Sequence, residues 1–127
     1  MLLTFSKPQF EAKIKAGIKI HTIREDKTNR WKVGMKIHFW MGNPRNNRGQ
    51  VKPHQFGTGR VSNIDRITIY PALNRIDLDG ITFTKFDYLD MIAIADGFEN
   101  WPEMRQFFYP HNVFQGKLIY WNDLNFE

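Results

Sequence analysis

The chain has 127 residues, of which 42% are hydrophobic and 15% aromatic, and it contains no cysteine. This composition predicts a folded globule rather than a disordered segment, and it excludes disulfides, thiol catalysis and cysteine-ligated zinc. The net charge of +5 is unevenly distributed, because residues 1–60 carry 13 Lys/Arg against 3 Asp/Glu, whereas residues 61–127 carry 5 against 10. The basic half is typical of a chain that binds a phosphate-rich partner, although a solvated basic face without a partner has the same composition.

The length suits one domain with one core, and we expect a single domain that spans residues 1–127. The apolar runs are far shorter than a membrane span, and the chain does not start with a signal-peptide pattern. Together with the lack of cysteine, these features favour a cytoplasmic protein without a membrane partner.

The first third of the chain predicts a strand, a short helix and two further strands. Residues 2–5 form a short apolar run, and Ser6 is placed to cap a helix that stops at Gly17. Residues 19–24 are rich in β-forming side chains, and residues 35–41 alternate in polarity as a strand does.

The middle third predicts a long loop followed by strands. Residues 42–57 hold three glycines, two prolines and three asparagines, and we expect a long mobile loop there. Residues 59–70 predict a bent strand and residues 73–78 another. Asp79-Gly80 is a hairpin signal before residues 81–83.

The last third predicts two helices and a closing strand over residues 114–121. Asp87 is placed to cap a helix that runs to about Asp96 and stops at Gly97, and Asn100 is placed to cap the next helix. In total, about six strands and three short helices predict an α+β domain with a mixed, barrel-like sheet.

Lys19, Thr22 and Arg24 place a hydroxyl between two cations. Thr22 and Arg24 are two residues apart and share a strand face, whereas Lys19 reaches Thr22 only if the chain bends after Gly17. A lysine near another cation has a lowered proton affinity, which a general base requires. The alternative is that Thr22 is an ordinary strand residue and Lys19 an exposed one.

Asp96 is the second candidate for a role in chemistry. It continues the apolar stripe of Leu89 and Ile92, and it lies at a helix C-terminus, where the helix dipole disfavours an acid. A carboxylate in that place is expected to face a cationic cleft, unless the helix end is simply solvated.

Substrate binding is assigned to cations of the basic half and to one tryptophan. Trp31 lies in a charged segment, and we expect it to be exposed and able to stack on a base. The histidines lack metal-ligand spacing, so we expect no metal. The candidate binding residues are Lys7, Arg24, Arg30, Trp31, Arg45 and Arg48.

At these residues the sequence resembles the ASCH domain, a family of the PUA-like superfamily. The opening segment matches in order and spacing at Ser6-Lys7-Pro8, Ile14, Gly17, Lys19 and Thr22-Ile23-Arg24. Weaker matches follow at Gly34, Ala93, Asp96-Gly97-Phe98, Trp101, Glu103 and Met104. Residues 42–56 and about 70–80 look like insertions relative to the smallest family members.

The resemblance implies a PUA-like mixed β-barrel with short flanking helices and a cleft that faces RNA or a modified nucleoside. One bacterial branch of the family removes the acetyl group of 4-acetylcytidine with a Lys base, a Thr nucleophile and a Glu acid. Lys19 and Thr22 match the first two positions, and Asp96 lies at or beside the third with a shorter side chain. Other ASCH proteins are linked to RNA cleavage, and no cofactor is implied.

The sequence therefore leaves three functions open. The first is a binding module for RNA or a modified nucleoside, which the aspartate at position 96 and the basic side chains of loop 42–56 favour. The second is an amidohydrolase that acts on 4-acetylcytidine through Lys19, Thr22 and Asp96. The third is a ribonuclease.

Overall fold

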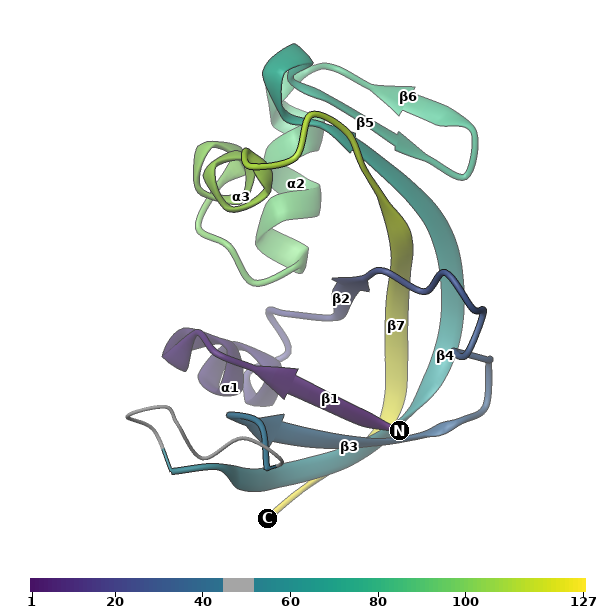
Figure 1. Cartoon of the computed structure of the whole chain (residues 1–127). Coiled ribbons are helices and arrows are strands. Elements are labelled where there is room, and N and C mark those ends of the chain that lie inside the picture. Colours follow the sequence, from purple (N-terminus) through teal and green to yellow (C-terminus); the bar gives the residue numbers. More distant parts are fainter. Residues whose placement is uncertain (45–51) are drawn as a thin grey trace.

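Seven strands form one mixed sheet, with three α-helices packed against it, in a computed structural model that describes residues 1–44 and 52–127 (Figure 1). The strands are β1 (Leu2–Phe5), β2 (His21–Arg24), β3 (Lys36–Met41), β4 (His54–Tyr70), β5 (Arg75–Leu78), β6 (Ile81–Phe83) and β7 (Phe114–Phe126). The helices are α1 (Pro8–Lys15), α2 (Phe86–Ala95) and α3 (Trp101–Phe108), with a 3₁₀ turn at Pro71–Leu73.

The sheet curls but does not close into a barrel, so the expectation of a β-barrel is wrong in this respect. Strand β1 pairs in parallel with β3, and β3, β4, β5 and β6 follow as antiparallel neighbours. Strand β7 pairs antiparallel with both β4 and β2. No ladder joins β1 to β2 in the described residues, and instead the Arg24 guanidinium of β2 donates to the Thr4 carbonyl of β1 at 2.8 Å.

The two long strands β4 and β7 run side by side through the whole molecule (Figure 1). Helices α2 and α3 lie near one end of this pair, and β1, β3 and α1 lie near the other. At the second end, the rings of Phe5, Phe39, Phe56 and Trp121 contact one another with centroids 5.1 to 6.4 Å apart. Burial of these rings is the main stabilising term there, because each aromatic side chain removes a large apolar area from water.

Local sequence signals explain several of the elements. Alternation in β3 points Ile37, Phe39 and Met41 into the core. The hairpin expected at Asp79-Gly80 is confirmed, since both residues have positive φ, 49° and 83°, as a tight turn of this kind requires.

Helix caps were predicted with mixed success. Asn100 is confirmed as the N-cap of α3, because its side chain accepts a hydrogen bond from the Glu103 amide at 2.9 Å. Ser6 and Asp87 are wrong as caps. Helix α1 starts at Pro8, which favours the first helical position and makes Lys7 the N-cap. Helix α2 starts at Phe86 with Lys85 as its N-cap, two residues earlier than expected, so Asp87 lies in its first turn, where an acid interacts favourably with the helix dipole.

The strand boundaries also differ from the expectations. Strand β2 begins at His21 rather than at residue 19, because the amides of Ile18 and Lys19 still donate to the Lys13 carbonyl at the end of α1. Strand β4 begins at His54, inside the expected loop, and β7 continues to Phe126 because it pairs with β4 along its length. None of the helices that the structure describes has the length and apolar character that crossing a bilayer requires.

Candidate functional site

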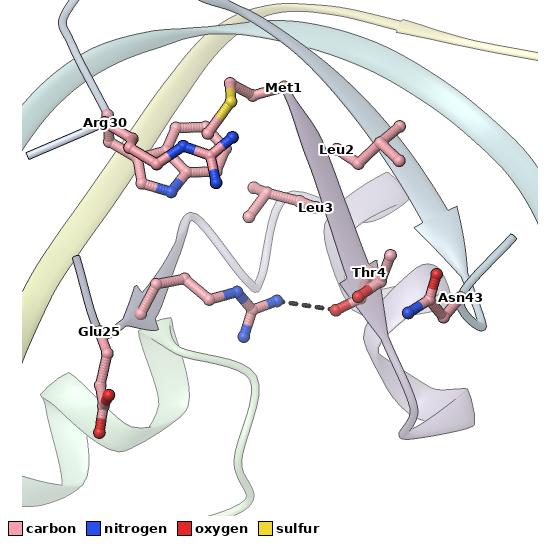
Figure 2. A pocket seen from close by; sticks show the side chains of 9 residues that line it. Met1, Leu2, Leu3, Thr4, Glu25, Arg30 and Asn43 are labelled. Atoms are coloured by element: carbon pink, nitrogen blue, oxygen red, sulfur yellow. Dashed lines mark hydrogen bonds between the residues drawn. The ribbon is translucent and has the colours of Figure 1, made fainter. Parts of the chain in front are cut away.

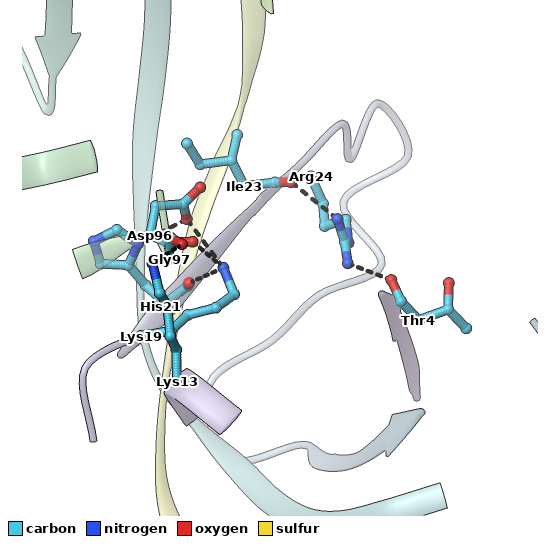
Figure 3. A network of polar contacts seen from close by, with 8 residues as sticks. All are labelled: Thr4, Lys13, Lys19, His21, Ile23, Arg24, Asp96 and Gly97. Carbon is cyan, nitrogen blue, oxygen red and sulfur yellow. Dashed lines mark hydrogen bonds and ion pairs between the residues drawn. The ribbon is translucent and has the colours of Figure 1, made fainter. Parts of the chain in front are cut away.

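A buried polar cluster joins the start of β2 to the end of α2 (Figure 3). Lys19, His21 and Asp96 are 1%, 3% and 4% exposed. The Lys19 Nζ atom donates to the backbone carbonyls of His21, at 2.8 Å, and of Asp96, and it lies 3.6 Å from Asp96 Oδ1. The same carboxylate oxygen lies 3.0 Å from His21 Nδ1. The Asp96 carboxylate is therefore held between a cation and an imidazole, and it is not a solvated helix end.

Aromatic rings surround the rest of the lysine side chain. The Lys19 Nζ atom lies 4.4 Å from the ring centre of Phe10, 5.5 Å from that of Phe5 and 6.0 Å from that of Trp121. Such rings attract a cation through their electron-rich faces, and they exclude water from it. Lys19 is thus a buried residue rather than an exposed one.

The turn after α2 is built to accept this lysine. Gly97 has a φ of +101°, and a Cβ atom there would lie 2.8 Å from Lys19 Cδ and 2.8 Å from the Phe10 ring. Lys13 of α1 donates to the Gly97 carbonyl at 2.9 Å and to Glu99 Oε1 at 2.7 Å. A residue without a side chain is needed at position 97, and α1 fixes the turn from the other side.

Burial lowers the pKa of Lys19 from 10.5 to about 8, although the charge of Asp96 acts in the opposite direction. The positive charges of Arg24 and Lys13 lower it further. A lysine with this pKa is neutral in about a tenth of molecules at neutral pH, which an ordinary lysine is not. Neutral lysine can accept a proton, so this group has the acid–base character that a general base needs.

Thr22 lies next to this cluster on β2, opposite Ile119 of β7, and is 3% exposed. Its hydroxyl forms no hydrogen bond within residues 1–44 and 52–127. The partners of the Lys19 ammonium are the carbonyls of His21 and Asp96, not the Thr22 hydroxyl. A neutral Lys19 would keep two N–H groups for these carbonyls and one lone pair to accept a proton, but no hydrogen bond joins it to Thr22 within residues 1–44 and 52–127.

A separate pocket of about 500 Å³ opens between β1 and β2 (Figure 2). Two arginines and one tryptophan that the sequence assigned to substrate binding meet here. The lining residues are Met1, Leu2, Leu3, Thr4, Arg24, Glu25, Arg30, Trp31 and Asn43. Besides its bond to the Thr4 carbonyl, the Arg24 guanidinium lies 5.2 Å from the Phe5 ring centre.

Asp26 fixes the backbone that carries Arg30 and Trp31. Its carboxylate accepts hydrogen bonds from the Arg30 amide at 2.7 Å, from the Trp31 amide at 3.0 Å and from Lys117 Nζ at 3.0 Å. Burial of Asp26 acts to raise its pKa, but the bonds from Trp31, Arg30 and Lys117 outweigh this and lower the pKa. The segment between β2 and β3 is therefore an ordered structure and not a free charged loop.

The structure places the other expected binding residues as follows. Trp31 is only 7% exposed, so the expectation of an exposed tryptophan is wrong, because the ring packs into the core while one part lines the pocket. The Lys7 Nζ atom lies 5.8 Å from the ring centre of Phe107 and does not line this pocket. Arg45 and Arg48 lie outside the described residues.

The expected residues thus form two groups rather than one cleft: the buried cluster of Lys19, His21 and Asp96 with Thr22 beside it, and the pocket with Arg24, Arg30 and Trp31. Arg24 connects them, since its charge lowers the Lys19 pKa while it lines the pocket.

Sequence reasoning missed the roles of His21, Lys13 and Asp26. An aspartate followed four and five residues later by the amides that it binds is a local signal that could have identified Asp26. His21 contacts Asp96, 75 positions away, and Lys13 contacts Gly97, 84 positions away. No local sequence pattern predicts contacts between such distant residues.

Within the part of the chain that the structure describes, no three His, Cys, Asp or Glu side chains lie together as a metal site would need. Comparison of the chain with models of protein families, with curated proteins and with solved structures finds no match.

Proposed function

We propose that the protein binds RNA or a modified nucleoside in the pocket between β1 and β2. The observation that carries this proposal is the meeting of Arg24, Arg30 and Trp31 in one pocket of about 500 Å³. That volume lies within the range of small-molecule sites. Arginines bind phosphate through several donors, and an indole offers a surface on which a base can stack.

Two further arguments support the proposal. Residues 1–60, which supply this pocket, carry 13 Lys/Arg against 3 Asp/Glu, as expected for a surface that attracts a polyanion. The resemblance of the opening segment to ASCH domains points to the same class of ligand. We also propose that the fold is PUA-like, because an open, strongly curved mixed sheet is consistent with such a fold.

Cytidine 5′-monophosphate titrated into the protein by calorimetry tests this function. Arg30 is exposed, so Arg30→Ala should leave the fold intact, and we expect it to weaken binding about tenfold, the value of one charge-assisted hydrogen bond. Lys32→Ala removes an exposed cation that does not line the pocket, and it serves as the matched control. An Arg30→Ala variant that binds as tightly as the Lys32→Ala variant would contradict the proposed site.

A second candidate function is hydrolysis of the acetyl amide of 4-acetylcytidine. The observation that favours it is a buried lysine with a pKa of about 8 in contact with Asp96, close in sequence to a hydroxyl that has no hydrogen-bond partner in the described residues. Thr22 Oγ1 would attack the acetyl carbon and pass its proton to neutral Lys19. The N4 amine would then leave with the proton that Lys19 had taken up, and water would release acetate from the acyl-threonine.

Incubation with 4-acetylcytidine and chromatography of the products test this candidate. Thr22→Val keeps the branched shape of the side chain and removes the hydroxyl, and we expect it to abolish release of cytidine. Thr22→Ser keeps the hydroxyl and should retain part of the activity. Equal activity in the wild type and in Thr22→Val would exclude Thr22 as the nucleophile. If the wild type releases no cytidine, hydrolysis is excluded and only the binding function stays proposed.

A further inference from the structure

The segment between β2 and β3 is surrounded by three cavities that share residues with one another. The pocket between β1 and β2 shares Glu25, Arg30 and Trp31 with a cavity of about 260 Å³ that lies over this segment. That cavity in turn shares Asp26 and Lys27 with a third cavity of about 450 Å³. Because neighbouring cavities share lining residues, we treat the three hollows as one groove that runs from the β1–β2 pocket past this segment to the third cavity.

The third cavity lies against the paired strands β4 and β7. Besides Asp26, Lys27 and Asn29, it is lined by Arg66, Ile67, Thr68, Gln115, Gly116 and Lys117. Arg66 and Lys117 lie directly opposite each other on β4 and β7, and two like charges in such a pair destabilise a sheet. A negative charge near the pair would remove this cost.

One member of that pair is already neutralised within the protein. Lys117 Nζ donates to Asp26 at 3.0 Å and to Asn29 at 2.5 Å, so the charges of Asp26 and Lys117 neutralise each other. The Arg66 side chain is exposed, and it makes no hydrogen bond or ion pair within residues 1–44 and 52–127. Its charge is therefore available to a ligand.

The remaining charges along the groove are mostly positive. The Lys27 side chain is 86% exposed, and its Nζ atom makes a long ion pair of 3.9 Å with Glu25, whose side chain is half exposed. An exposed pair at that distance is weak. Arg24 and Arg30 stand at one end, Lys27 in the middle and Arg66 at the other end, so the groove presents cations along its whole course.

We infer that this groove carries the backbone of a single-stranded RNA, with one base in the β1–β2 pocket and the phosphates of neighbouring nucleotides at Lys27 and Arg66. The inference rests on the proposed function and deepens it, because it assigns the ligand as a polymer rather than a free nucleoside. A single strand fits, since a base can enter a pocket only when it is unstacked from a helix. A row of cations that follows the strand adds affinity without reading its sequence.

The test compares cytidine 5′-monophosphate with an oligocytidylate of about eight nucleotides, by fluorescence anisotropy or calorimetry between about 50 and about 200 mM KCl. We expect the oligomer to bind more tightly and with a steeper salt dependence. In the double variant Lys27→Gln/Arg66→Gln, the slope of log K against log salt for the oligomer should fall by about 1.4, which is about 0.7 for each lost phosphate contact. Lys85→Gln is the control, because Lys85 precedes α2 and lines none of the three cavities.

The outcomes separate this inference from the proposed pocket. A double variant that keeps the wild-type salt slope would overturn the groove, as would an oligomer that binds no more tightly than the mononucleotide. Equal affinity for duplex RNA of the same length would overturn the assignment to a single strand. If the oligomer behaves as expected while the mononucleotide does not bind, the groove stands and the pocket proposal is wrong.

Discussion

Replacement of Lys19 by methionine is expected to remove a pH dependence from the stability of the fold. Burial lowers the pKa of Lys19 from 10.5 to about 8 in the folded protein, against the opposing charge of Asp96. Between these two pH values the unfolded chain keeps the proton that the folded chain has released. The free energy of unfolding must therefore rise with pH in that window, because stability increases wherever the unfolded state binds more protons.

The magnitude follows from the shift. Each pKa unit corresponds to about 1.4 kcal/mol, so a fall from 10.5 to about 8 is worth about 3 kcal/mol. This contribution is complete above the unfolded value of 10.5 and is lost as the pH falls through about 8. With 1% of the residue exposed, little of it is screened by solvent. Between about pH 7 and about pH 10 the wild type should gain about 2 to 3 kcal/mol relative to Lys19→Met.

Urea unfolding followed by tryptophan fluorescence, repeated across this pH range, measures the effect. Other groups also titrate at high pH, among them Tyr120, whose pKa is raised by burial and by Asp65. These groups are present in both proteins, so the difference between the wild type and Lys19→Met isolates the lysine. Lys85→Met is the control for loss of an exposed lysine. A difference between the wild type and Lys19→Met that stays constant from pH 7 to pH 10 would refute the reasoning.

Three further changes test the architecture around the site by thermal or urea unfolding. Gly97→Ala should destabilise the fold by about 2 kcal/mol or more, because its Cβ would meet the Phe10 ring at a backbone φ of +101°; a smaller loss would mean that the turn relaxes. Asn100→Ala should cost about 1 kcal/mol through loss of the α3 cap, and Asn100→Asp should restore it. The stability that Asp26 contributes is present above about pH 4 and is lost as the pH falls through its lowered folded pKa. The stability advantage of the wild type over Asp26→Ala should therefore shrink in acid. An advantage that persists in acid would show that the negative charge of Asp26 does not stabilise the fold.

The features that could be read from the sequence are those that depend on neighbours along the chain. Asn100 caps α3 and Asp79-Gly80 makes a hairpin because the required residue types lie within a few positions of each other. The cap of α1 was misplaced by one residue, since Ser6 and Lys7 both precede a proline and only the proline decides where the helix begins.

The features that could not be read depend on contacts between distant segments. Whether Lys19 is exposed or buried is decided by Phe5, Phe10 and Trp121, which come from β1, α1 and β7. Closure of the sheet likewise depends on whether β1 meets β2, and both strands have apolar residues that would suit a closed barrel. Apolar patterning identifies a buried face, but it does not say which edge strand lies across from another.

Arg24 makes the pocket and the buried cluster interdependent, and this has a measurable consequence. Its charge lowers the pKa of Lys19, and it also lines the pocket in which we propose that a phosphate binds. A bound phosphate would offset the charge of Arg24 and so raise the pKa of Lys19. Because such coupling is reciprocal, the protein with protonated Lys19 must bind the phosphate more tightly than the protein with neutral Lys19. The affinity for cytidine 5′-monophosphate should therefore decline as the pH rises through about 8, the pKa of the free protein, whereas uncharged cytidine should show little change. Lys19→Met should abolish the decline, and a decline that persists in this variant would mean that the pocket titrates through another group.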